Sequence, residues 1–192
     1  MKDSDIRQVI LSYLSREYDN DSDTMIIEEL GLCQGEARVD IAIVNGLIHG
    51  FEIKSDQDTL KRLPAQAEIY NRSLDSVTLV VGSKHLDKAL KVIPKWWGVV
   101  VAREKSGQIH LKVRRKGKPN PCLDLSSVVQ LLWRDEAYEA LVERGLHRGL
   151  ANKPRTILWK KLTELLSIEE LKVLIGNALK SRENWRSGYQ QA

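Results

Sequence analysis

Hydrophobic and polar positions alternate along the chain in patterns typical of helices and of strands, and the order of these patterns predicts the order of the elements. Apolar residues between Ile6 and Leu14 recur at steps of three and four, which predicts a helix with one apolar stripe that ends near Tyr18. Shorter runs then predict three strands, over residues 24–30, 38–44 and 48–55. Asn45 and Gly46 join the last two strands and are a strong hairpin signal. The pattern therefore predicts a helix followed by a β-meander.

The pattern then returns to a helix and to a strand that is apolar on both faces. A helix is predicted over residues 59–73, where Pro64 suits either a first turn or a bend. The β-branched run at residues 77–82 predicts a central strand covered by helices on both sides. Another helix and two strands follow, over residues 84–92, 98–102 and 108–114. The predicted fold class is α/β, with a core ordered as helix, three-strand meander, helix and strand.

The C-terminal part of the chain has only helical periodicity. Residues 116–121 are rich in Gly, Pro and Lys and are expected to form a linker. Three helices are predicted beyond it, over residues 126–145, 155–166 and 168–181. Ser167 and Glu170 have the spacing of a capping box at the start of the last helix. We therefore expect a core over residues 1–118 and a helical C-terminal segment over residues 122–192.

The composition is that of a globular protein. The chain has 192 residues, of which 42% are hydrophobic and 29% charged, enough to bury a core without disulfides. No apolar run is long enough to cross a bilayer and the N-terminus lacks the layout of a signal peptide, so we expect no membrane partner and a cytoplasmic location. Cys33 and Cys122 lack metal-ligand spacing and are expected to be reduced and structural.

Charge is unevenly distributed, although the formal net charge is only +4. The first thirty residues hold three basic side chains against eight acidic ones. Residues 103–119, in contrast, hold seven basic side chains against Glu104, and residues 144–161 hold six and no acid. Clusters of Lys and Arg are typical of proteins that bind a polyphosphate, which makes nucleic acid the expected partner. Solvated loops and helix faces are the simpler explanation of either cluster taken alone.

Three charged residues on the predicted hairpin carry the strongest chemical signal. Strand side chains alternate between the two faces of a sheet, so Glu52 and Lys54 point the same way. Asp40 lies on the partner strand, and the twist of the sheet can bring its carboxylate toward Glu52. Two such carboxylates repel each other and lose hydration, and a Mg²⁺ ion removes that conflict. Lys54 beside the ion would then activate a metal-bound water.

The pattern E-x-K is not specific by itself, since about one copy is expected by chance in a chain of this size. Glu170 and Lys172 form a second copy in a predicted helix, where side chains two apart do not face each other. Only the strand copy has an acid on a paired strand. A simple ion pair across the sheet surface is the alternative for Glu52 and Lys54.

At these residues the sequence resembles the PD-(D/E)xK nuclease superfamily, which has the restriction-endonuclease-like fold. Asp40 takes the D position, Glu52 the D/E position and Lys54 the K position. Further segments look similar to an uncharacterised bacterial and phage family within it, the sce7726-like family. They are Glu28-Glu29-Leu30-Gly31-Leu32, Ala37-Arg38-Val39-Asp40, Phe51-Glu52-Ile53-Lys54-Ser55, Asp58-Thr59-Leu60, Leu63-Pro64-Ala65-Gln66, Leu132-Trp133-Arg134-Asp135 and Lys153-Pro154-Arg155. The resemblance covers most of the chain, and the order of the predicted elements also matches the core of that superfamily.

The resemblance implies a metal-dependent deoxyribonuclease, and an endonuclease is the expected type. Asp40 and Glu52 would hold Mg²⁺ or Mn²⁺ and Lys54 would activate the water that hydrolyses a DNA phosphodiester. Some superfamily members lack activity, so the alternative is a non-cleaving nucleic-acid-binding or regulatory module with a degenerate nuclease fold. An RNA-directed nuclease is a third hypothesis. Dimers are common in the superfamily, which adds a homodimer to the expected assemblies.

Further side chains are expected around this site. Many superfamily members add an upstream glutamate as a metal ligand, and Glu29 is favoured here, with Glu28 and Glu17 as rivals. The helix after the E-x-K strand often turns a polar residue toward the metal or the phosphate, which makes Gln66 a candidate catalytic residue. Tyr70 shares a helix face with Gln66 and is expected in the core.

Five basic residues are candidates for contacts with nucleic acid. They are Arg38, Lys61, Arg62, Lys153 and Arg155. The first three lie close to the predicted site in the sequence, and the other two belong to the C-terminal basic cluster. Solvated charges, and an ion pair with Asp40 in the case of Arg38, are the simpler explanations.

Overall fold

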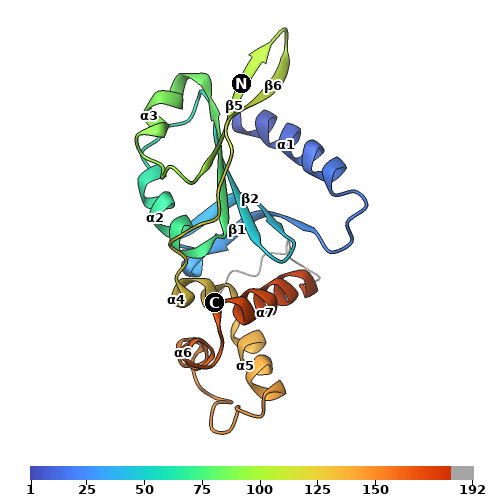
Figure 1. The fold of residues 1–192 in the computed structure, drawn as a ribbon, viewed down its shortest axis with the longest axis vertical. Helices are drawn as coiled ribbons and strands as arrows, with labels where there is room; N and C mark the ends of the chain where they lie inside the picture. The colour runs from blue at the N-terminus through green and yellow to red at the C-terminus, as the bar shows by residue number, and fades with distance from the viewer. Residues whose placement is uncertain (183–192) are drawn as a thin grey trace.

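The structure of the chain, a computed structural model, describes residues 1–182. Within that range the chain forms one six-stranded sheet with α-helices on both faces (Figure 1), so the α/β class is confirmed. The strands are β1 (Met25–Leu32), β2 (Ala37–Val44), β3 (Ile48–Lys54), β4 (Ser76–Gly82), β5 (Gly98–Lys105) and β6 (Gln108–Arg115). The α-helices are α1 (Asp3–Glu17), α2 (Leu63–Ser73), α3 (Leu86–Leu90), α4 (Leu125–Val128), α5 (Arg134–Glu143), α6 (Arg155–Leu165) and α7 (Ile168–Ser181).

The sheet is mixed, and its strands lie in sequence order. The first three strands form the antiparallel meander that the pattern predicts. β4 then pairs in parallel with β3, and β5 pairs in parallel with β4. Both pairs are parallel because α2 and the segment that contains α3 each return the chain to the end of the sheet where the preceding strand began. β6 closes the sheet as an antiparallel hairpin with β5. From α1 to β4 the succession is helix, three-strand meander, helix and strand.

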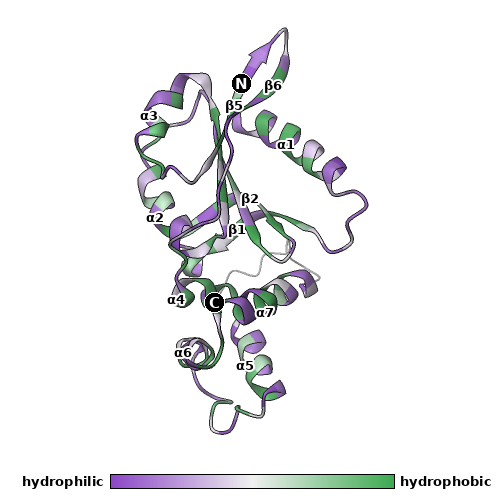
Figure 2. Ribbon diagram, viewed as in Figure 1, coloured by the Kyte–Doolittle hydropathy of each residue, from purple (hydrophilic) through white to green (hydrophobic). Residues whose placement is uncertain are grey.

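Helices cover the two faces of the sheet with separate apolar layers. α1 packs on one face through Ile6, Ile10 and Leu14, which are buried against sheet residues that include Ile41 and Ile53. α2, α3 and the C-terminal helices contribute to one continuous cluster on the other face. Figure 2 shows hydrophobic residues along α1 and a hydrophilic loop after it. Each buried Ile or Leu side chain contributes roughly 1.5–3 kcal/mol, so the apolar stripe holds α1 firmly on the sheet.

Two helices are shorter than the pattern predicts. α2 begins at Leu63, so Pro64 occupies its first turn and residues 59–62 lie outside the helix. The helix expected over residues 84–92 consists of a 3₁₀ turn, Ser83–His85, and the five residues of α3. In both places the apolar pattern extends beyond the hydrogen-bonded helix, because turn residues also pack against the sheet.

The C-terminal segment is helical, but its first predicted helix is interrupted. Instead of one helix over residues 126–145, the chain forms α4, a 3₁₀ turn at Val129–Leu131 and α5. Leu132 separates them, because its backbone is extended with φ −77° and ψ 133°. The capping box of Ser167 and Glu170 is confirmed at the start of α7.

The fold bears on what the composition predicts for the two cysteines and for membrane-spanning helices. Cys33 and Cys122 are both free thiols, but only Cys33 is buried. The structural role expected for Cys122 is therefore wrong, because that side chain is exposed. None of the helices within residues 1–182 is both long enough and apolar enough to cross a membrane.

Candidate functional site

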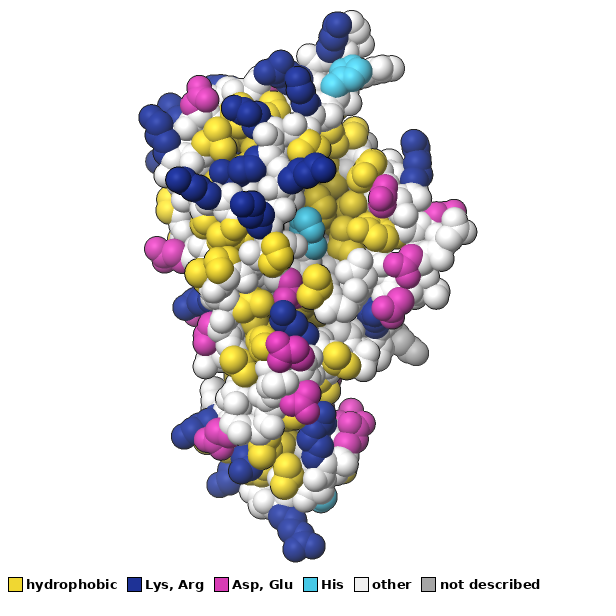
Figure 3. All heavy atoms as spheres, viewed as in Figure 1, with side chains coloured by type: hydrophobic (Ala, Val, Ile, Leu, Met, Phe, Trp, Pro, Cys, Tyr) yellow, Lys and Arg dark blue, Asp and Glu magenta, His cyan; other side chains and the backbone are white. Residues whose placement is uncertain are grey.

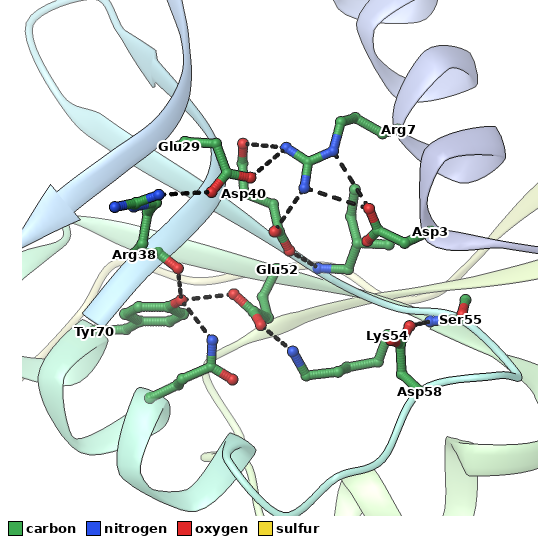
Figure 4. A network of polar contacts seen from close by, with 12 residues as sticks. Asp3, Arg7, Glu29, Arg38, Asp40, Glu52, Lys54, Ser55, Asp58 and Tyr70 are labelled. Carbon is green, nitrogen blue, oxygen red and sulfur yellow. Dashed lines mark hydrogen bonds and ion pairs between the residues drawn. The ribbon is translucent and has the colours of Figure 1, made fainter. Parts of the chain in front are cut away.

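A polar site lies where β2 and β3 stop pairing, between α1 on one side and α2 on the other (Figure 4). Backbone pairing of the two strands ends at Ile41 and Phe51. Beyond that point Asp40 takes the place of a strand partner with its side chain, because Oδ2 accepts a hydrogen bond from the backbone N–H of Ile53 at 2.6 Å. A carboxylate therefore fills the gap between the diverging strands. We call this region the strand fork.

Arg7 of α1 reaches the strand fork and ties the helix to the sheet. Its Nη2 lies 2.8 Å from Asp40 Oδ1, and its Nη1 donates to the backbone oxygen of Asp40 at 2.9 Å. The same guanidinium pairs with Glu29 at 2.8 Å and with Asp3 at 3.4 Å. Burial acts to lower the pKa of Arg7, but the three carboxylates raise it overall. One largely buried cation thus contacts three acids.

Glu29 reaches Arg7 because the first two strands are irregular at this point. Its backbone lies in the left-handed region with φ 58°, a conformation that costs a non-glycine residue about 1–3 kcal/mol. Glu28 pairs with Ile41 and Leu30 pairs with Val39, but the pairing of β1 with β2 is interrupted between them. Glu29 and Asp40 lie opposite each other at this interruption. Glu29 Oε2 also lies 3.7 Å from Arg38. The distortion therefore presents two acids to the same guanidinium.

The two rivals of Glu29 occupy other positions. Glu28 lies in the regular ladder of β1 and β2, opposite Ile41. Glu17 is exposed at the last residue of α1, where its hydrogen bond raises the pKa of the Tyr13 hydroxyl. The structure thus brings Glu29 close to Asp40 through Arg7, and it leaves Glu17 at the helix end.

Glu52 and Lys54 form a buried ion pair on the side of β3 that faces α2. Glu52 is 1% exposed and Lys54 is 5% exposed. The second carboxylate oxygen of Glu52 accepts a hydrogen bond from the Tyr70 hydroxyl at 2.6 Å. Burial, and then the charge of Glu52, raise the pKa of Tyr70, so the phenol keeps its proton and serves as a donor. The pair is therefore enclosed by protein groups.

Asp40 and Glu52 are coupled through their charges. The pKa of Asp40 is raised to about 7, because burial disfavours its ionised form and Glu52 adds a second negative charge nearby. The backbone N–H of Ile53 and the cations Arg7 and Lys54 act in the opposite direction. Asp40 therefore changes its charge near neutral pH, whereas an ordinary exposed aspartate is fully ionised there.

Gln66 points into the strand fork from the first turn of α2. Its Nε2 donates to the Tyr70 hydroxyl at 3.2 Å, and its Oε1 is buried without a hydrogen-bond partner in the described part of the chain. Tyr70 is a core residue, as its helix face indicates, but it is also a central member of the polar network. Sequence reasoning missed that role and missed Arg7 altogether. The one available signal for Arg7 is a basic residue beside the apolar stripe of a helix.

The arrangement at the strand fork does not fit a divalent ion as it stands. Each carboxylate oxygen of Asp40 and Glu52 already faces a protein donor. Mg²⁺ requires oxygen ligands that can complete an octahedral shell. Residues 1–182 contain no group of three or more His, Cys, Asp or Glu side chains arranged to hold a metal ion. Binding of Mg²⁺ or Mn²⁺ by Asp40, Glu52 and Glu29 therefore stays a prediction.

The candidate contacts with nucleic acid are distributed over two parts of the fold. Arg38 is 65% exposed beside Glu29, and Lys61 and Arg62 are exposed ahead of α2. Lys153 is exposed before α6. Arg155 donates a hydrogen bond to the side-chain oxygen of Gln34 at 2.7 Å, so its guanidinium is engaged within the chain.

Exposed Lys and Arg side chains form a second candidate site, which we call the basic surface. Its members are Lys84, Lys88, Lys91, Lys95, Arg103, Lys105, Lys112, Arg114, Lys116 and Lys118. Asp87 and Glu104 are the acids of this stretch, and Glu104 pairs with the N-terminal amine of Met1 at 3.2 Å. Within the described residues, no member of the basic surface forms an ion pair. Figure 3 shows Lys and Arg side chains gathered over α3 and the β5–β6 hairpin.

Comparison with known proteins gives one consistent match. The model of the family described as bacteriophage P4 protein cII matches residues 1–189. Protein cII of Enterobacteria phage P4 is 31% identical over 163 residues, which is 84% of this chain. The chain spans 60% of the length of that relative. No solved structure matches the chain.

This match corrects the function expected from the E-x-K motif. The chain matches the P4 cII family along nearly its whole length, so the expected membership of the PD-(D/E)xK superfamily, and of its sce7726-like family, is wrong. The expected Mg²⁺-dependent deoxyribonuclease, an endonuclease and hydrolase, is wrong for the same reason. Asp40, Glu52 and Lys54 lie in one network, but their partners in it are Arg7 and Tyr70. A short acidic motif on paired strands was too weak a signal for catalysis.

Proposed function

Because the chain belongs to the bacteriophage P4 cII protein family, we propose that it is a phage regulatory protein that binds DNA without cleaving it. The basic surface carries this proposal, since its cations have no acidic partner among the described residues. A surface of unpaired Lys and Arg releases counterions when it meets a polyphosphate, and this release favours binding. DNA is the polyanion that a regulatory protein of this kind would bind.

The strand fork supports a structural role for its charged residues. The Lys54 ammonium is held by the buried carboxylate of Glu52, and Asp40 is held by Arg7 and a backbone amide. These contacts join α1, β2, β3 and α2, which are the elements that surround the fork. In this proposal the network stabilises the fold on which the basic surface is displayed.

The proposal extends to the core and to the setting of the protein. The succession from α1 to β4 supports a core of restriction-endonuclease-like topology, which we propose to serve as a binding scaffold. We further propose a division into a core over residues 1–118 and a helical segment from residue 122, and a cytoplasmic location. We also propose that the chain forms a homodimer, which would place two basic surfaces on one duplex. Sedimentation of the whole chain tests this assembly.

Fluorescence anisotropy with a labelled DNA duplex tests the proposed function. We expect the wild-type protein to bind equally well with Mn²⁺ and with EDTA, because Lys and Arg need no metal to contact phosphate. We also expect supercoiled plasmid to remain intact in both buffers. Binding that requires the metal, or nicking of the plasmid that depends on Lys54, would contradict the proposal.

Matched variants locate the binding surface. Replacement of Lys88, Lys91 and Lys112 by Gln removes three charges from the basic surface and is expected to weaken binding about tenfold or more. The control replaces Arg144, Arg148 and Lys160 by Gln, which removes the same charge from exposed positions of the C-terminal basic cluster. It is expected to bind as the wild type does. Loss of binding in the control alone would move the site to the helical segment.

A further inference from the structure

The β5–β6 hairpin extends past the body of the sheet, as the upper end of Figure 1 shows. Its strands pair up to Lys105 and Gln108, and the turn between them has two residues, Ser106 and Gly107. Both turn residues have positive φ, 52° and 74°. This is the geometry of a tight type I′ turn, which matches the twist of two antiparallel strands. The outer part of the hairpin is therefore a narrow, twisted ribbon with an exposed tip.

The two faces of this ribbon differ in chemistry. Ile109 and Leu111 pack against the apolar cluster under α1, and so they anchor the hairpin to the body of the protein. The residues between and after them, His110 and Lys112, point to the opposite face because side chains alternate along a strand. Arg103 lies directly across from His110 and is exposed. One face thus holds the ribbon in place, and the other offers basic and hydrogen-bonding side chains to solvent.

α3 lies on the same side of the sheet as this free face. Its buried residue Ala89 belongs to the apolar cluster that includes Val99 of β5, and that cluster is separate from the one under α1. Lys88 and Lys91 are exposed on α3 and on the turn that follows it. Lysines therefore flank the ribbon on the side to which Lys112 points.

Acidic side chains elsewhere in the molecule contrast with the basic side chains of the hairpin and α3. The loop after α1 carries Asp19, Asp21 and Asp23, all exposed. In Figure 3, acidic side chains border that part of the molecule, and basic ones gather at the hairpin and α3. A polyanion is attracted to the hairpin and α3 and repelled from the loop after α1. The hairpin and α3 are consequently favoured over the loop after α1 as the surface that contacts DNA.

From these features we infer that the β5–β6 hairpin enters the major groove of duplex DNA, while lysines of α3 contact the phosphates beside it. The major groove of B-form DNA, about 12 Å wide, admits a two-stranded ribbon. Arg103, Gln108 and His110 stand near the tip, where they would reach base edges, and Lys88 and Lys91 would contact the backbone. The inference rests on the proposed DNA binding and adds the groove, the element that enters it and the form of the nucleic acid.

The choice of nucleic acid provides the first test. Double-stranded RNA has a deep and narrow major groove that a ribbon does not enter, and single strands have no groove. The wild-type chain is therefore expected to bind B-form DNA at least about tenfold more tightly than double-stranded RNA or single-stranded DNA of the same sequence. Equal affinity for all three nucleic acids would overturn the inference, although DNA binding itself would stand.

Blocking one groove at a time provides the second test. A duplex in which cytosines carry glucosylated hydroxymethyl groups has a filled major groove, and netropsin fills the minor groove. We expect the modified duplex to bind about tenfold more weakly and netropsin to have no effect. Competition by netropsin with no effect of the modification would place the hairpin outside the major groove and overturn the inference.

Two double variants separate the hairpin from α3. Arg103→Ala with His110→Ala removes tip side chains, and Lys88→Ala with Lys91→Ala removes the flanking lysines. All four side chains are exposed, and thermal melting followed by circular dichroism checks that both variants fold. Both are expected to bind more weakly, but only the hairpin variant should lose the discrimination between plain and glucosylated duplexes. A hairpin variant that keeps this discrimination overturns the inference, whereas a wild-type chain that binds no DNA overturns the proposed function itself.

Discussion

At the scale of single residues, Asp40 joins diverging strands and carries a charge that depends on pH. Its carboxylate replaces a backbone partner for Ile53 and binds Arg7 of α1. Burial and the neighbouring Glu52 raise its pKa to about 7. The connection of α1 to the sheet is therefore expected to respond to pH in the neutral range.

The pH dependence of stability tests this expectation. An unfolded aspartate titrates near pH 3.9, so the folded chain binds the extra proton of Asp40 between about pH 4 and pH 7. Stability from this group is present at the acid end of that range and is lost as the pH rises through 7. Wild-type stability should therefore fall, relative to Asp40→Asn, by about 1 kcal/mol between pH 6 and pH 8. Urea unfolding of both proteins measures it, and parallel curves would refute the assignment.

The comparison with Asp40→Asn also removes the contribution of a half-buried histidine, His49. Burial lowers the pKa of His49 to about 4, so its stabilising effect increases with pH, opposite to that of Asp40. Both proteins contain His49, and its effect cancels in the difference between their unfolding free energies.

The buried pair of Glu52 and Lys54 predicts a large loss of stability on truncation. Lys54→Ala leaves the Glu52 carboxylate buried without its cation, which is expected to cost about 3–5 kcal/mol. Glu52→Gln combined with Lys54→Met removes both charges and should restore most of that loss. Lys61→Ala, at an exposed position, is the control and should stay within about 0.5 kcal/mol of wild type. Denaturant midpoints as high for Lys54→Ala as for wild type would show that the pair is not needed.

Spacing alone predicts part of the polar network. The period of two along a strand places Glu52 and Lys54 on one face, and the hairpin places Asp40 nearby. The period gives no information about Arg7 and Tyr70, because they reach the fork from helices whose packing depends on the whole fold. Without those partners the three charged residues resemble a catalytic set, and this is why the functional interpretation failed.

At the scale of elements, the β5–β6 hairpin depends on its two-residue turn. Ser106 occupies a left-handed position that Asn adopts more readily, and Gly107 meets the requirement of the second position. The pattern predicts the hairpin but ends β5 at residue 102, whereas β5 continues to Lys105. Charged residues after Ala102 conceal the strand from a hydrophobic pattern, because residues 103–108 are all exposed.

Substitutions in the turn should change the local stability of the hairpin. Ser106→Asn is expected to slow amide hydrogen exchange in β6 about twofold, because Asn-Gly is the favoured pair in a type I′ turn. Gly107→Val is expected to accelerate exchange about tenfold, since a β-branched residue is strained at positive φ. Exchange in α7 serves as the internal control. No change in β6 with Gly107→Val would mean that the turn does not support the hairpin.

At the scale of the whole molecule, the fold separates a stabilising network from a basic surface. Arg7, Asp40 and Glu52 form part of a network between the helices on either side of the sheet. The unpaired cations lie at the other edge, on α3, β5 and β6. The sequence indicates this clustering through its charge asymmetry, although it does not indicate that α3 and the hairpin share one side of the sheet. That arrangement depends on the parallel pairing of β4 with β5.

The salt dependence of DNA binding measures how many phosphates the basic surface contacts. For the wild-type chain, the logarithm of affinity should fall linearly with the logarithm of salt concentration, with a slope of about −0.9 for each phosphate contact. The Gln variant of Lys88, Lys91 and Lys112 should have a slope shallower by about three, and the control variant of Arg144, Arg148 and Lys160 should keep the wild-type slope. Identical slopes for wild type and the basic-surface variant, or no binding at any salt concentration, would show that the basic surface does not contact DNA phosphates.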